Sequence, residues 1–317
     1  MHEYWLYGSR VESDTALCNS AWPAPELQWN EITGVRLSRA CSIPGIELRY
    51  GMVFQSCHGR QLSLHCEHPL DANCPGCIRE FRVEDVVTFQ WCSGSGEVQY
   101  ACAETDEPTL LGFWFNHIFL PIYLALEEDF DFMHGSAVDI AGSAALFIAP
   151  STGGKSTLAQ YFVERGHALL ADDKLCVRRH GRRWYGVPAH PHLRDWREFE
   201  VLGTPVEHYT DSALLLGAIY ALEQAPPDDT VHIGEVSGFD RLEYLIPQHL
   251  YDFLPFRQRR LQRVAALAAG MPLLRLSRPW DLMRLDEVYR VVCETQVARS
   301  HATWSNEDPV VRLQLSA

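Results

Sequence analysis

Apolar and polar side chains alternate in short runs over the first part of this 317-residue chain. An alternation with a period of two residues is typical of strands that bury one face. Turn residues separate the runs, and none of them has the 3.6-residue period of a long helix. Residues 1–105 are therefore predicted to form a β-rich N-terminal domain. The predicted strands include residues 4–7, 46–50, 62–64, 81–83 and 86–91.

The pattern changes near residue 110, where a long apolar and aromatic run extends to residue 124. This run predicts a buried helix between the two parts of the chain, with a kink where Pro121 lacks a backbone donor. Residues 106–317 are predicted to form a second domain of the α+β class, with a loosely ordered tail after about Gln296. Its predicted elements include a hairpin turning at 141–142, a strand at 216–220 and helices at 261–269 and 282–292.

An apolar strand that ends at Ala149 leads into a loop of small residues, and a helix is predicted from about Lys155. Strand, loop, Gly-Lys-Ser and helix in this order are typical of a phosphate-binding loop, or Walker A motif. Glycines let backbone N–H groups point at an anion, and the helix dipole adds positive potential. Lys155 is predicted to reach the phosphates of ATP, and Ser156 to hold Mg²⁺. The predicted nucleotide-binding residues are Ser151, Thr152, Gly153, Gly154, Lys155, Ser156 and Thr157.

The loop departs from the usual pattern at its first position, where this chain has Ala149 in place of glycine. Alanine does not take a positive φ cheaply, so the chain is expected to enter the loop by a different path. The alternative interpretation is a glycine-rich turn that binds nothing. Gly-Gly-Lys-Ser-Thr between an apolar strand and a helix favours nucleotide binding.

A second apolar strand ends in Asp172 and Asp173. Beside a phosphate loop, one carboxylate of such a pair can orient magnesium and the other can take a proton from an acceptor hydroxyl. The alternative interpretation is that these aspartates cap a helix or a turn and have no catalytic role. Alternating directions at a strand end predict that the two side chains point to different sides. Arg194 is expected either to contact phosphate or to pair with Asp195 or Glu198.

Composition limits the partners and the compartment. The net charge of -14 argues against a protein that binds nucleic acid through its phosphates. The first residues lack the basic start and apolar core of a signal peptide. No apolar run is expected to approach the roughly 20 residues that span a bilayer. A cytoplasmic protein without membrane contact is therefore expected, and its 10 cysteines are expected to be free thiols or metal ligands.

Cys74 and Cys77 form a C-x₂-C pair within the β-rich part, and Pro-Gly between them favours a turn that aims both thiolates at one ion. A structural zinc site is one interpretation, and unliganded thiols in a turn-rich segment are the other. The two further ligands of such a site are expected from Cys66 or His68, and from Cys57 or His58.

Four motifs together resemble the catalytic domain of the HPr serine kinase/phosphorylases: residues 134–136, the phosphate loop, residues 165–167 and residues 170–173. The likeness is closer to short bacterial HPr-kinase-like proteins, some of which phosphorylate the C-terminal serine of a lasso-peptide precursor. It covers about residues 110–200 firmly. The opening residues 7–14 and the segment 188–196 also look like those of these relatives.

The resemblance implies a core like that of phosphoenolpyruvate carboxykinase, with a phosphate loop placed differently from that of ordinary nucleotide-binding α/β proteins. It also implies that Asp172 is the general base, that Asp173 holds Mg²⁺ with Ser156, and that His134 lies near the transferred phosphate. Thr152-Gly153 replaces the family's Gly-x order, and the C-terminal motif used for phosphorylase activity is not found. Kinase action is therefore better supported than the reverse reaction, and HPr is not the expected substrate.

The expected function is that of an ATP-dependent kinase, a transferase acting on a serine of a peptide or small protein such as a lasso-peptide precursor. The β-rich domain would help to bind this acceptor. One alternative is a non-catalytic regulator that responds to a nucleotide, and another is a kinase of a small molecule such as a sugar. The acidic pair favours the kinase over the regulator, because a pure switch needs no base.

Overall fold

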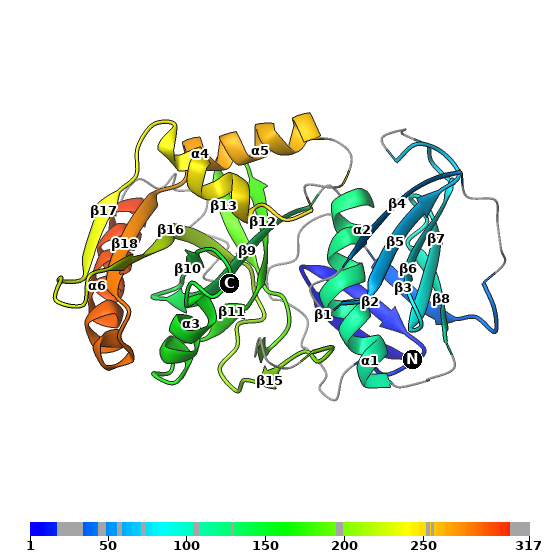
Figure 1. Ribbon diagram of the computed structural model, residues 1–317, viewed down its shortest axis with the longest axis horizontal. Coiled ribbons are helices and arrows are strands. Elements are labelled where there is room, and N and C mark those ends of the chain that lie inside the picture. The colour runs from blue at the N-terminus through cyan, green and yellow to red at the C-terminus, as the bar shows by residue number, and fades with distance from the viewer. Residues whose placement is uncertain are drawn as a thin grey trace.

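The computed structural model describes residues 1–17, 34–43, 49–55, 59–70, 74–103, 108–127, 130–194, 199–251, 254 and 257–304. Two large β-sheets lie on either side of a helical segment (Figure 1). One continuous apolar core joins these parts, and it includes Phe89 of the first sheet, Phe119 of the helical segment and Phe132 of the second sheet. The chain is thus a mixed α/β protein whose N-terminal part is rich in strands.

The first sheet has eight strands in the order β1-β2-β3-β8-β7-β6-β5-β4. Strand β3 is parallel to β2 and β8, and the other neighbours are antiparallel. The described residues up to Cys102 contain no helix. Residues 46–48 of one predicted strand lie outside the described residues. The strands are β1 (His2–Leu6), β2 (Ser9–Ser13), β3 (Gly34–Arg39), β4 (Tyr50–Gln55), β5 (Gln61–Cys66), β6 (Ile78–Val83), β7 (Val87–Cys92) and β8 (Glu97–Cys102).

The predicted central helix is present as three consecutive helical segments: the α-helix α1 (Pro108–Phe113), a π-helix (Trp114–Phe119) and the α-helix α2 (Leu120–Glu127). The π-helix ends two residues before Pro121. A proline ring clashes with the carbonyl group four residues earlier in a regular α-helix, and a wider turn relieves this clash. The kink itself stays a prediction, and the departure from a regular α-helix near Pro121 is this π-helix.

The segment Thr109–Glu127 is long and apolar enough, by length and composition alone, to cross a membrane. The expectation that no apolar run approaches this length was therefore wrong. Within the protein, 78% of its most apolar window is buried. Phe119 stacks on Phe89 of β7 with ring centroids 4.3 Å apart, which shows that the first sheet covers this helix.

Glu127 fixes the end of α2 to the first sheet. Its carboxylate accepts hydrogen bonds from Arg79 Nη1 at 2.7 Å and from Trp91 Nε1 at 2.7 Å. Ser93 Oγ and the Gly94 amide donate to it as well, at 2.9 and 3.0 Å. The side chains of Arg79 and Glu127 are only 5% and 4% exposed, so this ion pair is buried.

The second sheet follows the order β10-β9-β12-β13-β16-β18-β17, with β11 (Leu169–Ala171) paired to β9. The hairpin predicted at 141–142 joins β9 to β10, and Ile140 pairs directly with Ser143. Both turn residues have positive φ, as a two-residue hairpin requires. The strands are β9 (Asp131–Ile140), β10 (Ser143–Ile148), β12 (Lys174–His180), β13 (Arg183–Val187), β16 (Leu214–Ala225), β17 (His232–Glu235) and β18 (Leu273–Pro279), while β14 (His192–Leu193) and β15 (Thr204–Pro205) form a small separate sheet.

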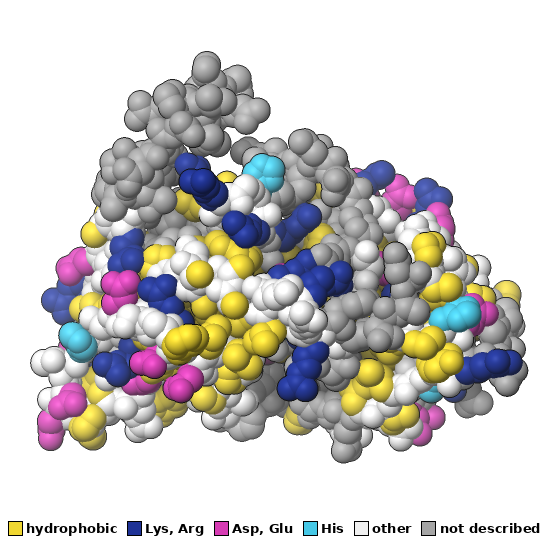
Figure 2. All heavy atoms as spheres, turned by 90° about the horizontal axis from the view of Figure 1, so that it is seen from above, with side chains coloured by type: hydrophobic (Ala, Val, Ile, Leu, Met, Phe, Trp, Pro, Cys, Tyr) yellow, Lys and Arg dark blue, Asp and Glu magenta, His cyan; other side chains and the backbone are white. Residues whose placement is uncertain are grey.

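Helices cover the second sheet. They are α3 (Lys155–Val163), α4 (Asp240–Leu245), α5 (Arg257–Gly270) and α6 (Leu285–Trp304), with 3₁₀ turns at Ile246–Gln248 and Leu282–Arg284. The predicted helices at 261–269 and 282–292 lie within these elements. The predicted tail was wrong at its start, because α6 continues to Trp304 and Gln296 is buried, donating to Ser143 Oγ at 2.8 Å. The face over α4 and α5 carries several Lys and Arg side chains among apolar ones, despite the negative net charge (Figure 2).

Candidate active site

The glycine loop, residues 149–154, connects the end of β10 to the start of α3. Its left-handed positions are Thr152, with φ of 63°, and Gly154, with φ of 81°. Ala149 is not among the residues with positive φ, so the missing first glycine causes no backbone strain there. Gly153 permits a close turn, because a Cβ there would lie 2.5 Å from that of Ala149.

Lys155 begins α3 and is 6% exposed. Its ammonium folds back over the loop and donates to the carbonyl oxygens of Ala149 and Pro150, at 2.9 and 3.1 Å. Burial lowers the pKa of this ammonium below its ordinary value. The first N–H groups of a helix have no partner within the helix. A buried cation and these N–H groups thus share one end of α3, which is the donor set that an anion requires.

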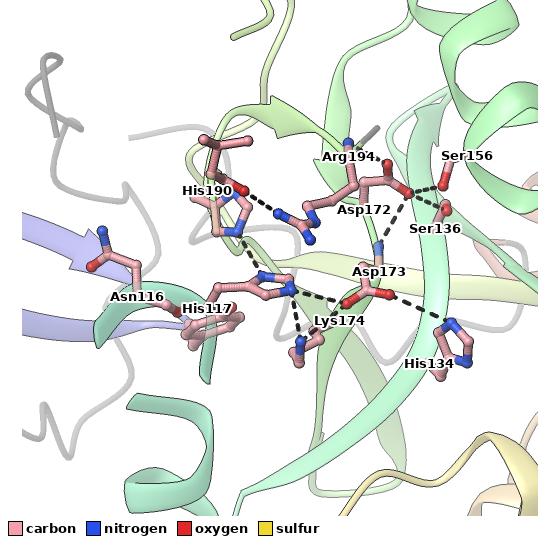
Figure 3. A network of polar contacts seen from close by, with 12 residues as sticks. Asn116, His117, His134, Ser136, Ser156, Asp172, Asp173, Lys174, His190 and Arg194 are labelled. Carbon is pink, nitrogen blue, oxygen red and sulfur yellow. Dashed lines mark hydrogen bonds and ion pairs between the residues drawn. The ribbon is translucent and has the colours of Figure 1, made fainter. Parts of the chain in front are cut away.

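Asp172 follows β11 and is 1% exposed. Its Oδ1 accepts from the hydroxyls of Ser136 and Ser156, the latter at 2.9 Å, and its Oδ2 accepts from the Arg194 amide at 2.8 Å (Figure 3). Burial raises the pKa of this carboxyl, against the hydrogen bonds that lower it. The side chain therefore points toward the start of α3, where it meets the residue after Lys155.

Asp173 turns the other way, as predicted for adjacent residues at a strand end, and its φ is 74°. Its oxygens lie 3.0 Å from Lys174 Nζ, 3.1 Å from His117 Nε2 and 3.5 Å from His134 Nε2 (Figure 3). Desolvation raises the pKa of this carboxyl, but the Lys174 ammonium and His117 outweigh it and hold the pKa well below its ordinary value. With 33% of its side chain exposed, Asp173 is an ionised and accessible carboxylate.

His117 and Lys174 complete this cluster, and sequence reasoning missed both. His117 lies in the π-helix, 1% exposed, with Nε2 2.8 Å from Lys174 Nζ and Nδ1 3.3 Å from His190 Nε2. Burial, with the Lys174 charge, lowers the pKa of His117 to about 3. The only sequence signal was a polar pair, Asn116-His117, inside an apolar run that was interpreted as core. A π-helix often marks a functional site, but the sequence does not reveal one.

Arg194 contacts Asp172 through its backbone amide. Its amide donates to Asp172, whereas its guanidinium donates to the Val201 carbonyl and lies 5.2 Å from the centre of the Phe113 ring. The phosphate contact and the pairing with Asp195 or Glu198 both stay predictions. Residues 195–198, which include both carboxylates predicted as alternative partners, lie outside the described residues.

The predicted zinc site receives no support. In the part of the chain that the structure describes, no group of three or more His, Cys, Asp or Glu side chains could hold a metal ion. Cys66 Sγ and Cys77 Sγ are buried 3.7 Å apart, and burial with this neighbour raises the pKa of Cys77 to about 11. Cys74 is half-buried and His68 is exposed, while Cys57 and His58 lie outside the described residues.

The structure therefore brings together five residues predicted as site residues: His134, Lys155, Ser156, Asp172 and Asp173 (Figure 3 shows all but Lys155). Oxygen atoms converge where Ser156 Oγ meets Asp172 Oδ1. Hydroxyl and carboxylate oxygens are the ligands that Mg²⁺ takes in proteins. The remaining loop residues follow in order along the turn, and Thr157 is exposed in the first turn of α3.

Comparison with known proteins confirms the resemblance predicted from the motifs. No family model matches the chain. An HPr kinase/phosphorylase of Chlorobium phaeovibrioides is 52% identical over 48 residues, which are 15% of this chain and 14% of the relative. One from Mycoplasmopsis pulmonis is 31% identical over 87 residues, 27% of this chain and 26% of the relative. The aligned part thus spans about a quarter or less of these curated relatives.

A solved structure, the HPr(Ser) kinase/phosphatase from Coxiella burnetii, overlaps 55% of this chain and 99% of its own with a TM-score of 0.34 and 13% sequence identity. The local sequence matches, and not this overlap, carry the likeness to HPr kinase/phosphorylases. This chain therefore resembles that family over a limited segment.

Proposed function

Starting from the resemblance to HPr kinase/phosphorylases, we propose that this protein is an ATP-dependent kinase that transfers the γ-phosphate to a hydroxyl group. The observation that supports this most is the paired arrangement of Asp172 and Asp173. One carboxylate faces Ser156 at the start of α3, and the other is ionised, accessible and close to His134. A protein that only sensed a nucleotide would not need the second carboxylate, so the arrangement favours catalysis over regulation.

The triphosphate is held by the glycine loop. The N–H groups at the start of α3 bind the phosphate oxygens, and Lys155 exchanges its contacts with Ala149 and Pro150 for the β- and γ-phosphates. Ser156 and Asp172 are the residues that would hold magnesium. When bound, the ion neutralises charge on the phosphate oxygens.

The general base is Asp173, the reverse of the order that the resemblance had implied for the two aspartates. Asp172 is nearly inaccessible and already accepts hydrogen bonds from two hydroxyls and an amide. Asp173 has an exposed edge, with 33% of its side chain accessible, and it faces His134. In the reaction, the acceptor oxygen bonds to the γ-phosphorus, the bond to the β-phosphate oxygen breaks to release ADP, and the acceptor proton passes to Asp173.

The acceptor we propose is a serine of a peptide or small protein, on the resemblance to short HPr-kinase-like proteins, with a lasso-peptide precursor as the specific candidate. The first sheet is the proposed surface for the acceptor, because its covering helix carries His117 to within 3.1 Å of Asp173. Binding of an acceptor at this part of the chain would therefore be close to the proposed base.

The experiment is a transfer assay with ATP labelled at the γ-phosphate, Mg²⁺ and two synthetic peptides that differ only in a C-terminal serine or alanine. The expected result is label on the serine peptide alone, and none with Lys155→Ala. Arg182→Ala, which removes an exposed charge at the β12–β13 turn, is the matched control and should transfer normally. Stoichiometric ATP binding without transfer to any hydroxyl, across peptides and sugars, would leave the regulator as the correct function.

A further inference from the structure

Trp280 is a half-exposed aromatic residue for which the proposed reaction has no use. Its exposed fraction is 53%, although an indole is among the side chains that gain most from burial. It follows directly after β18, which is parallel to β16, and β16 is parallel to β10. The C-terminal ends of these three strands therefore lie on the same side of the sheet. The glycine loop leaves β10 on this side, and ligands of parallel sheets bind outside the carboxyl ends of the strands.

Arg278 connects Trp280 to the glycine loop. Its Nη2 donates to the Gly153 carbonyl at 3.1 Å, and its Cζ lies 5.0 Å from the centre of the Trp280 ring. Arg278 is 5% exposed, and within the described residues its Nε has no hydrogen-bond partner. A buried guanidinium that lies over one face of an indole fixes the ring by a cation–π contact. The other end of the same guanidinium fixes the loop.

Gly154 shows how closely the pair approaches the loop. Its φ is 81°, and a Cβ built there would lie 2.3 Å from Arg278 Nη2 and 3.5 Å from Trp280 Cη2. The edge of the indole is therefore in contact range of the residue directly before Lys155. A ligand whose phosphates lie on the start of α3 would have an aromatic ring beside it.

We propose that Trp280, held by Arg278 against Gly154, is the platform on which the base of a nucleoside triphosphate stacks. This inference rests on the proposed kinase function and deepens it. The glycine loop contacts the phosphates, which free tripolyphosphate and a nucleoside triphosphate have in common. An aromatic ring adds a contact that only the base can make. Stacking accepts any base, because each has a π face. The platform thus distinguishes a nucleotide from free triphosphate.

The experiment measures binding of two ligands, ATP and inorganic tripolyphosphate, each with Mg²⁺, by calorimetry on the full chain. Trp280→Ala should weaken ATP binding by roughly 5- to 100-fold, the range for loss of one base–aromatic stack, and leave tripolyphosphate binding unchanged. Trp280→Phe should retain most of the ATP affinity. Met283→Ala removes a neighbouring apolar side chain that is 89% exposed, and it should change neither affinity.

Two outcomes would contradict the proposal that the base stacks on Trp280. Unchanged ATP affinity in Trp280→Ala would show that the base binds elsewhere. An equal loss for ATP and tripolyphosphate would show that Trp280 only supports the shape of the glycine loop. A wild-type protein that binds neither ligand would instead refute the proposed function, so the two failures are distinguishable.

Discussion

The hydroxyl of Ser156 lies 2.9 Å from Oδ1 of Asp172, so the residue after the loop lysine and the first carboxylate of the acidic pair form one set of oxygen ligands. Asp173 has no part in this set and faces His134. The two neighbouring carboxylates therefore have different surroundings, and replacing each should have a different effect.

Asp173→Asn should lower phosphoryl transfer by roughly 10²-fold or more, the usual scale for loss of a general base, with ATP affinity nearly intact. Asp172→Asn should raise the Mg²⁺ concentration needed for half-maximal activity, because it replaces a carboxyl ligand with an amide. The measurements are single-turnover rates and a Mg²⁺ titration for both variants. The opposite result is a transfer defect for Asp172→Asn and a Mg²⁺ defect for Asp173→Asn. It would show that Asp172 is the base and Asp173 the Mg²⁺ ligand, as the family resemblance implies.

Gly154→Ala should lower ATP affinity, because its Cβ would displace Arg278 from the glycine loop. Gly166→Ala is the matched control: its φ is 90°, and nothing lies within 4 Å of the added Cβ. Both variants should lose about 1–2 kcal/mol of unfolding free energy from left-handed strain. Chemical denaturation and ATP titration measure the two effects separately. Equal ATP affinity in both variants would mean that Arg278 does not help to shape the loop.

Acid should destabilise the protein through His117. Its pKa is about 3 in the folded chain and about 6.5 when unfolded, so below pH 6.5 the unfolded state binds the extra proton. Stability contributed by the neutral imidazole is complete above pH 6.5 and is lost as the pH falls toward 3, at about 1.4 kcal/mol per pH unit.

The test of this prediction is the slope of unfolding free energy between pH 4.5 and about 6. His117→Gln should reduce the slope by about one proton's contribution, whatever it does to the absolute stability. His68→Gln replaces an exposed histidine and is the control variant, measured over the same pH range. An unaltered slope in His117→Gln would show that other groups cause the acid sensitivity.

Glu127→Ala should destabilise the chain by about 3–5 kcal/mol, because it leaves the buried Arg79 guanidinium without its counter-charge. Denaturant unfolding of the single variants Glu127→Ala and Arg79→Ala and of the double variant measures the coupling. The double variant should lose less than the sum of the two single losses. Strictly additive losses would mean that the two side chains contribute independently.

Local sequence patterns predicted the parts of the site that are continuous in the chain. The hairpin at 141–142, the loop before Lys155 and the divergent directions of Asp172 and Asp173 all depend on neighbouring residues, whose preferences are local. The contacts of His117 with Lys174 and Asp173 join segments far apart in sequence, and no periodicity encodes them.

The contact of the Arg194 amide with Asp172 and the different surroundings of the two aspartates could not be predicted from the sequence, for a related reason. In both cases the packing of distant elements decides which groups meet. Arg194 contributes its amide, which every residue except proline possesses, so the sequence gives no signal for it. The neighbours of the two carboxylates come from β9, α3 and the π-helix, and their approach depends on how these elements pack.

The helical segment 108–127 is covered by the eight-stranded sheet, and this has a consequence for any shortened form of the protein. A chain cut near residue 105 would keep a stretch with the length and composition of a bilayer-spanning helix and lose the surface that shields it. Such a fragment should partition into detergent micelles or lipid vesicles. The N-terminal sheet thus covers a long apolar helix that would otherwise be exposed.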